Sequence, residues 1–275
     1  MNRRTLQEIV KGEYGRKVAF TDVEAIDESN IVKVVGSCIG VLNRNREIIK
    51  YLWDYKNGDQ PVLYREKTVR DDINNPVVEN HAWEIVQFKN AQINGEPIQC
   101  IAAKKEDKIN AAVERFNDYC RGANKHVKDI TGGEWTSAVG TSYKAVQRTR
   151  KGNEIPFRIV TPSPMNTMII YQRSTEEPIL AVQQLKDIDG NNYLLCFDDI
   201  YEYRIQNGSL LTLETLEGGI EVKRRLHAFG GIPIVEFPNN QDRVSDIELV
   251  ISILDALNEM QSNRMDAVCQ FVQSW

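Results

Sequence analysis

The amino-acid sequence predicts an α+β protein with a helical N-terminal portion, an antiparallel β-rich insert and one long C-terminal helix. Residues 29–139 carry apolar residues at spacings of three and four, which is typical of amphipathic helices. Residues 140–244 change to short aromatic and β-branched runs between glycine and asparagine turns, and residues 245–275 return to helical spacing. This order favours an α+β fold.

Composition excludes several classes of function. The chain has 275 residues, of which 41% are hydrophobic and 27% charged, enough for one large domain or two ordinary ones. A net charge of −5 counts against tight wrapping of DNA, although not against a protein that DNA slides past. The five cysteines show no CxxC spacing, which counts against a zinc site and a secreted disulfide framework. The most apolar window, IVKVVGSCIGVL, is too short to cross a bilayer, so no membrane partner is expected.

The first long helix is predicted over residues 31–55, after a polar N-terminal arm at residues 1–28. Gly36 and Gly40 lie one turn apart in it and are candidates for a helix-packing interface, because missing side chains let another backbone approach. Ordinary tight core packing is the other interpretation. The apolar residues of this helix keep the spacing of one face: Ile31, Val35, Cys38, Leu42, Ile49, Leu52 and Tyr55.

The stretch PVLYREKTVRDD predicts an extended segment before the second helix. Asn75 is a favourable N-cap and Pro76 suits the first helical position, so this helix is predicted to begin there and to fade near Asn90.

The next stretches predict a turn, a short strand and two helices. INGEP is a turn signal and IQCIAA has the pattern of a strand. KKEDKINAAVERFNDYCRG predicts a helix that stops at Gly122. A further helix over residues 126–139 contains Gly132 and Gly133, which favour a kink.

Residues 140–237 predict six to eight antiparallel strands. The hairpin signals are Lys-Gly-Asn at 151–153, Asp-Gly-Asn-Asn at 189–192, Asn-Gly at 207–208 and Gly-Gly at 218–219. The cationic run KRR at 223–225 is suited to phosphate or an acidic partner, but such runs are more typical of a solvated strand end.

The final helix is predicted to follow the connector PNNQDRVSD, with Ser245 or Asp246 as its N-cap. Thirty residues of helix span roughly 45 Å. Gln261 and Arg264 interrupt its apolar face and are candidate channel or intersubunit residues. The last turn carries no C-cap, which predicts that the helix continues in the natural protein. The apolar face comprises Ile247, Val250, Ile251, Leu254, Leu257, Met265, Val268, Phe271, Val272 and Trp275.

Catalytic chemistry has little support in the sequence, and no enzyme, metal site or cofactor is predicted. His81, His126 and His227 have no nucleophile or acid at a recognisable spacing. A metal-dependent hydrolase at Asp198 or Asp199 is the weakest of the hypotheses, because adjacent side chains on a strand point to opposite faces.

Three stretches resemble the portal proteins of tailed bacteriophages, of the type found in phages and prophages of Gram-positive bacteria. They are NNPVVENHAWEIVQFKNAQINGEPIQ, AVGTSYKAVQRTRKGNEIPFRIVTPSPMNTMIIYQ and FGGIPIVEFPNNQDRVSDIELVISILDALNEMQSNRMDAVCQFVQ. The likeness covers most of residues 30–275. Its strongest part is the last block, in which a strand, a Pro-Asn hinge and a long helix follow one another.

The resemblance implies a structural protein that forms a ring, usually a dodecamer, at one vertex of the capsid. Its implied partners are other copies of itself, terminase, head-completion and tail adaptor proteins, capsid or scaffolding proteins, and double-stranded DNA that passes without sequence specificity. It implies a location in the virion, and in the host cytoplasm during assembly. Residues 29–244 correspond to the wing and 245–275 to the first stem helix, whereas the clip, second stem helix and crown are absent from this sequence. The alternative is a monomeric or dimeric adaptor that binds a partner through the long helix.

Overall fold

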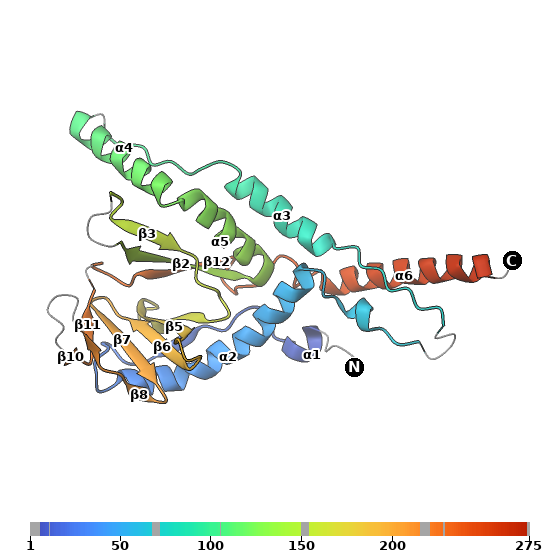
Figure 1. Ribbon diagram of the computed structural model, residues 1–275, viewed down its shortest axis with the longest axis horizontal. Helices are drawn as coiled ribbons and strands as arrows, with labels where there is room; N and C mark the ends of the chain where they lie inside the picture. The colour runs from blue at the N-terminus through green and yellow to red at the C-terminus, as the bar shows by residue number, and fades with distance from the viewer. Residues whose placement is uncertain are drawn as a thin grey trace.

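The protein is elongated, with an α+β body from which helix α6 (Ile251–Gln273) projects at one end (Figure 1). The predicted fold class is confirmed. The computed structural model describes residues 6–10, 12–67, 72–104, 106–149, 154–214, 221–227 and 229–273. Among the helices in these ranges, none combines the length and the apolar character needed to cross a bilayer.

Helix α2 (Ile31–Lys56) agrees with the prediction to within one residue, and its predicted apolar face is buried. Part of the predicted arm packs onto the body. Helix α1 (Leu6–Val10) inserts Leu6 and Val10 into the core beside the C-terminal half of α2. Strand β1 (Ala19–Thr21) pairs in parallel with β4.

The larger sheet has the order β1-β4-β5-β6-β7-β11, with β8 paired to β7. Apart from β1, its strands are antiparallel, as predicted. The N-terminal half of α2 packs on one face and shares a core with Ile170, Leu180 and Tyr203. The strands are β4 (Thr167–Gln172), β5 (Pro178–Lys186), β6 (Asn192–Phe197), β7 (Tyr201–Gln206), β8 (Ser209–Leu210) and β11 (Arg225–Leu226).

A second sheet of order β12-β2-β3 packs against the first. It consists of β2 (Thr141–Arg148), β3 (Phe157–Val160) and β12 (Ile234–Pro238). The core between the two sheets contains Tyr143, Ala145, Ile169, Ala181 and Ile234. Strands β9 (Leu213–Glu214) and β10 (Glu221–Val222) form a separate pair, so the region contains more strands than predicted.

Two predicted hairpin turns are confirmed. Gly190 lies in the β5–β6 turn at a φ of 84°. Asn207 and Gly208, between β7 and β8, both have positive φ, as a type I′ turn requires. The signals at 151–153 and 218–219 lie outside the described residues.

The predicted start of the second helix at Asn75 is wrong. Helix α3 (His81–Asn94) begins after Asn80, whose side chain accepts a hydrogen bond from the Trp83 N–H. Residues 74–80 instead run alongside α6, which supplies hydrogen-bond acceptors for their backbone. The predicted extended stretch before them begins with a short 3₁₀ helix, η1 (Pro61–Tyr64).

The predicted strand IQCIAA is not formed within the chain. Its residues run without regular structure between α3 and α4 (Asp107–Gly122). Helix α5 (Lys125–Val139) is continuous through Gly132 and Gly133. Gly133 makes room for α3, because a Cβ there would lie 2.3 Å from Oδ1 of Asn90.

Candidate assembly surface on helix α6

The base of helix α6 is fixed by a capping box. The Ser245 N–H donates to Oε2 of Glu248 at 3.1 Å, and the Glu248 N–H donates to Oγ of Ser245 at 3.2 Å. Ser245 is therefore the N-cap, one of the two predicted. It caps a turn at residues 246–250, after which the continuous helix begins at Ile251.

A buried ion pair lies directly under this cap. Nη2 of Arg16 donates to Oε1 of Glu248 at 2.6 Å, and both side chains are almost fully buried. The Gly15 N–H donates to the same oxygen at 3.0 Å. Burial lowers the pKa of Arg16, and Glu248 opposes that shift; arginine keeps its charge under such conditions. The pair connects the N-terminal segment to the start of α6.

The connector before α6 contains Asp242 and Arg243, and we call it the hinge. It packs against the backbones of two glycines. Gly15 and Gly140 both have positive φ, of 82° and 86°. A Cβ on Gly140 would lie 1.9 Å from the carbonyl oxygen of Arg243, and one on Gly15 would lie 2.0 Å from that of Asp242. A side chain at either position cannot be accommodated without moving the hinge.

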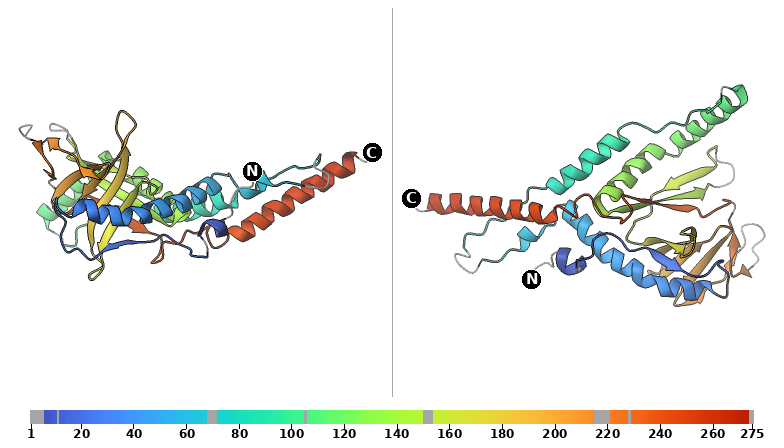
Figure 2. Two further views of the ribbon diagram at one scale, coloured as in Figure 1. Left: turned by 90° about the horizontal axis from the view of Figure 1, so that it is seen from below. Right: turned by 180° about the vertical axis from the view of Figure 1, so that it is seen from behind.

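Residues 60–67 and 72–80, here called the brace, lie along one side of α6 (Figures 1 and 2). Three polar side chains of α6, Asn258, Ser262 and Asp266, are spaced four residues apart and are buried. They form the inner stripe of the helix. Each accepts a hydrogen bond of 2.8 Å from a backbone N–H of the brace. The donors are Glu79, Val77 and Asn75, in that order.

The match between helix and brace is geometric. Four residues of helix rise about 6 Å. Two residues of an extended chain advance about 6.6 Å. A side chain on every fourth helical residue can therefore meet every second N–H of an extended chain. The inner stripe replaces a neighbouring strand for residues 75–79, which explains why Asn75 does not begin a helix.

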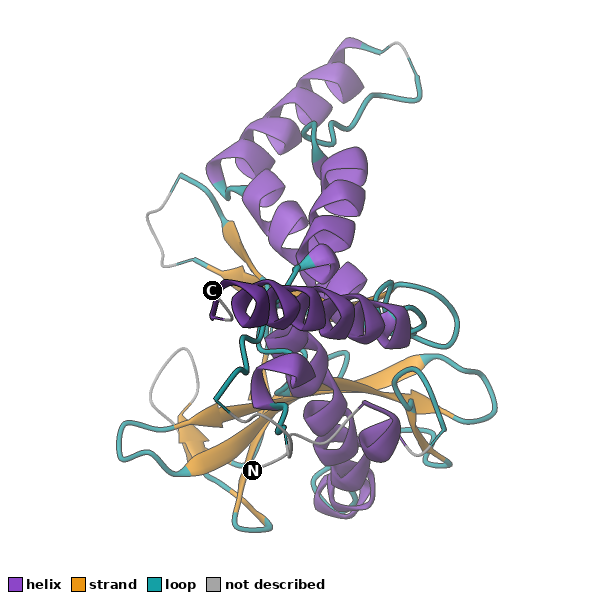
Figure 3. Ribbon diagram, turned by 90° about the vertical axis from the view of Figure 1, so that its right-hand side faces the viewer, coloured by secondary structure: helices purple, strands orange, loops and turns teal. Residues whose placement is uncertain are grey.

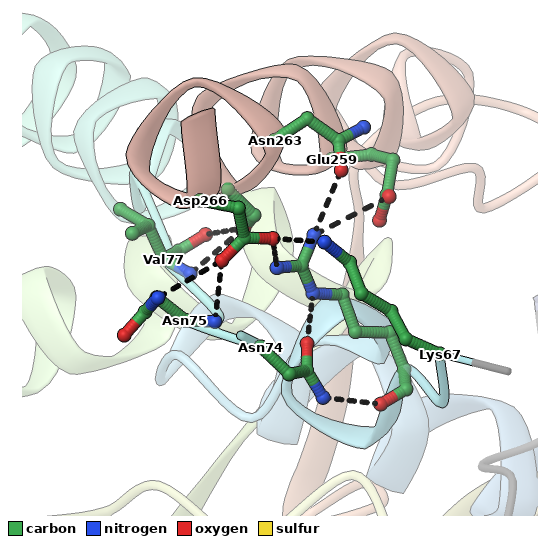
Figure 4. A network of polar contacts seen from close by, with 9 residues as sticks. Lys67, Asn74, Asn75, Val77, Glu259, Asn263 and Asp266 are labelled. Atoms are coloured by element: carbon green, nitrogen blue, oxygen red, sulfur yellow. Dashed lines mark hydrogen bonds and ion pairs between the residues drawn. The ribbon is translucent and has the colours of Figure 1, made fainter. Parts of the chain in front are cut away.

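Asp266 is the most heavily bonded member of the inner stripe (Figure 4). Its Oδ2 accepts from Nη2 of Arg65 at 2.5 Å and from Nζ of Lys67, and its Oδ1 also accepts from the Asn75 side chain at 3.0 Å. Burial raises the pKa of the Asp266 carboxyl, but these donors together outweigh burial and hold the pKa well below its usual range. The carboxylate is thus ionised while the helix is docked.

The opposite side of α6 is largely apolar and largely exposed, although Leu257 is half-buried and Arg264 is charged. We call Ile253, Leu257, Met260, Arg264 and Val268 the outer stripe, since they follow one another at helical spacings of three and four. The exposed fractions of Ile253, Met260 and Val268 are 60%, 60% and 54%. Within this chain, the polar side of the distal helix is buried and the apolar side faces solvent.

The sequence-predicted candidates lie in different places. Arg264 is exposed in the middle of the outer stripe, and Gln261 is half-buried at its margin. Gly36 and Gly40 are exposed on α2, and a Cβ on either would meet no atom within 4 Å. Within the described parts of the chain they make no close helix contact, and a contact with another copy stays a prediction.

The other polar candidates are engaged in local structure. Asp198 caps a turn, because Oδ1 accepts from the Ile200 N–H at 2.7 Å and Oδ2 accepts from the Tyr203 hydroxyl at 2.8 Å. Asp199 is exposed. Nη2 of Arg225 donates to both carboxylate oxygens of Glu202, at 2.8 Å each. Among the described residues, His, Cys, Asp and Glu form no group of three or more that could hold a metal ion.

A family model described as phage portal protein, SPP1 Gp6-like, matches residues 36–274. The chain belongs to this family. Portal proteins are structural proteins of bacteriophages, the head–tail connectors that serve in DNA packaging, so the resemblance seen in the sequence is confirmed. No curated protein matches the chain.

Sequence analysis of this portal protein missed the inner stripe. The sequence does contain a signal for it, since the polar residues Asn258, Ser262 and Asp266 recur at intervals of four on one side of the helix, opposite the outer stripe. A polar residue at such a spacing is normally assigned to solvent. The extended brace that buries these residues is nearly 200 positions away along the chain, and helical periodicity carries no information about it.

Proposed function

We propose that this portal protein assembles into a closed ring of about twelve copies around a channel through which double-stranded DNA is packaged and ejected. In this proposal the ring occupies one vertex of the capsid in the virion. It docks terminase during packaging and head-completion or tail proteins afterwards. Assembly takes place in the host cytoplasm with capsid or scaffolding proteins.

The outer stripe of α6 is the observation that carries the proposal. Its apolar side chains project from a helix whose inner stripe is already buried against the brace. A free chain would expose this surface to water, whereas a neighbouring copy would cover it. Helix α6 extends past the body in Figure 1 and lies in front of it, toward the viewer, in Figure 3, which leaves its outer side accessible to neighbours.

Ring closure needs two different complementary surfaces on each copy. The outer stripe of α6 is one candidate. The exposed face of α2 around Gly36 and Gly40 is the second, because these residues leave open space for a closely packed neighbour. We infer that Arg264 and Gln261 lie at the contact between copies or on the channel wall, with the net charge of −5 limiting adhesion of DNA.

The test is the mass in solution of the protein expressed from its complete reading frame, measured by light scattering after size exclusion, with negative-stain images of the same peak. We expect rings of about a dozen copies with a central hole. A monomer or dimer at high concentration would contradict the proposal and favour the adaptor function.

A matched pair of variants tests the part played by the outer stripe. Val268→Glu places a charge on the stripe, whereas Gln270→Glu places the same charge at an exposed position outside it. We expect Val268→Glu to prevent ring formation without changing the thermal stability of the monomer, and Gln270→Glu to leave both unchanged. Equal assembly of the two variants would exclude the stripe from the interface.

A further inference from the structure

Strand β3 has a free edge. The Val146 N–H donates to the Pro233 carbonyl at 2.9 Å, so the backbone groups of Val146 face β12. In an antiparallel sheet the facing alternates, so Ala145 and Gln147 face β3 and pair there with Val160 and Arg158. The backbone N–H and C=O groups of Phe157 and Ile159 consequently point away from β2, and no described strand pairs with them on that side.

A groove runs beside this edge. A cavity of about 710 Å³ lies between β3 and the junction of α4 with α5, lined by Val127 and Lys128 on the helical side and by Phe157, Arg158 and Ile159 on the strand. Val127 is 55% exposed. Neither Lys128 nor Arg158 has an ion-pair partner among the described residues. The groove thus offers apolar surface and unpaired backbone groups, beside charges of both signs on Lys128, Arg158 and Glu154.

A second stretch with unpaired backbone groups and exposed apolar side chains lies elsewhere on the same chain. Residues 97–103 have the pattern of a strand but no strand partner, and Ile98 and Ile101 are 62% and 88% exposed. The side chain of Asn117 on α4 holds both backbone groups of Cys100, accepting from its N–H at 3.0 Å and donating to its carbonyl at 2.9 Å.

Asn117 leaves one side of this segment available. In an extended run, the backbone groups of successive residues point to opposite sides. If Cys100 faces α4, those of Gln99 and Ile101 face outward. Within the described part of the chain they have no hydrogen-bond partner. The outward groups are two residues apart, the same interval as those of Phe157 and Ile159 on β3.

We propose that residues 97–103 of one copy add as a strand to the free edge of β3 in the next copy. The inference rests on the proposed ring. The segment and the β2–β3 pair lie on opposite sides of α4 (Figures 1 and 3), as a head-to-tail contact requires. The flanking residues Glu96, Lys104, Lys105 and Glu106 carry charges of both signs, so the contact depends on main-chain pairing and apolar side chains. Strand addition gains affinity from main-chain hydrogen bonds and specificity from alternate side chains.

The first test is photo-crosslinking in the protein expressed from its complete reading frame. A benzophenone amino acid replaces Ile101, and cross-linked peptides between copies are identified by mass spectrometry in a mixture of ¹⁴N- and ¹⁵N-labelled protein. We expect cross-links to residues 157–160 of another copy. The same amino acid in place of Ile188, which is fully exposed in the β5–β6 turn, serves as the control and should not cross-link to β3.

The second test uses two variants, each of which removes one backbone N–H donor from one side of the proposed contact. Ile159→Pro and Ile101→Pro each delete an outward N–H, at positions where proline is tolerated within the chain. We expect each to raise the protein concentration needed for half-assembly roughly five- to tenfold. Ile159→Val and Ile101→Val keep the backbone N–H and should leave the concentration needed for half-assembly unchanged.

The outcomes separate this inference from the proposed function. Intact wild-type rings with cross-links that avoid β3, or rings unaffected by either proline, would overturn the strand addition and leave ring formation standing. A wild-type protein that stays monomeric would overturn both. Cross-links at β3 that are weakened by Ile159→Pro would establish the contact.

Discussion

Helices α2 and α6 are similar in length but are held in opposite ways. Helix α2 buries its apolar face, including Leu42 and Leu52, against the sheet and the other helices. Distal α6 buries Asn258, Ser262 and Asp266 against the brace and exposes its apolar face. Burial of one large aliphatic side chain contributes about 1.5–3 kcal/mol. A hydrogen bond contributes only about 1 kcal/mol.

The difference separates the requirements of folding from those of assembly. A helix fixed by apolar burial has its apolar face in the core, so α2 can offer a neighbour only its other side, around Gly36 and Gly40. A helix positioned by hydrogen bonds to its own chain keeps that face available while its direction is already set. In the proposed ring, the brace would prepare α6 for association, because the helix need not be ordered again when a neighbouring copy binds.

The largest effect is expected where α6 joins the body. Glu248→Gln removes one charge of a buried pair and leaves the Arg16 guanidinium uncompensated, which costs about 3–5 kcal/mol. Chemical denaturation should show this loss in the free energy of unfolding. Glu259→Gln is the control, because the Glu259 side chain is 50% exposed and its contact with Arg65 is long at 3.4 Å. Similar losses in both variants would mean that the buried pair has no special role.

The next prediction compares the buried apolar face of α2 with the exposed outer stripe of α6. Leu52→Ala in α2 removes a fully buried side chain and should lower the free energy of unfolding by about 2–5 kcal/mol. Met260→Ala on the outer stripe should change it by less than about 0.5 kcal/mol in the unassembled chain. Thermal and urea unfolding at low protein concentration measure both. A large loss for Met260→Ala would show that the outer stripe packs within the chain.

The same contrast explains what could be predicted from the sequence. Helix α2 was predicted to within one residue because its packing follows local periodicity. The turns at Gly190 and Asn207 were predicted because their chemistry is local too. The class α+β follows from the order of such segments.

The errors occur where a distant residue overrides a local preference. Asn75 and Pro76 have the features of a helix start, but three side chains of α6 bind the backbone from Asn75 to Glu79 and keep it extended. IQCIAA has the pattern of a strand, but the chain provides Asn117 in place of a neighbouring strand. For the candidate site, periodicity predicted one apolar face for α6, but Ile247, Ile251 and Leu254 of that face are buried in the core. The exposed outer stripe includes Ile253 and Met260, which were not part of the prediction. The brace that orients the helix depends on contacts that no local pattern contains.

A smaller and more local effect is expected at the inner stripe. Asp266→Asn removes the charge that Arg65 and Lys67 share, and should weaken docking of the distal helix by about 1–3 kcal/mol. Hydrogen exchange should become faster at residues 258–270, while exchange in α2 stays unchanged. Gln270→Ala, at an exposed position, is the control and should alter neither. Faster exchange throughout the chain would show that the brace belongs to the same cooperative unit as the body.

The smallest effect is the pH dependence of the same contact. The pKa of Asp266 is lower in the docked state than in the unfolded chain, where a carboxyl of this type titrates near 3.9. Such a group adds stability that is fully present above the unfolded pKa and is lost as the pH falls toward the folded pKa. Protection of residues 258–270 should therefore be constant between about pH 7 and 5 and should decline below about pH 4. In Asp266→Asn this decline should be absent; its persistence there would assign the acid sensitivity to another carboxylate.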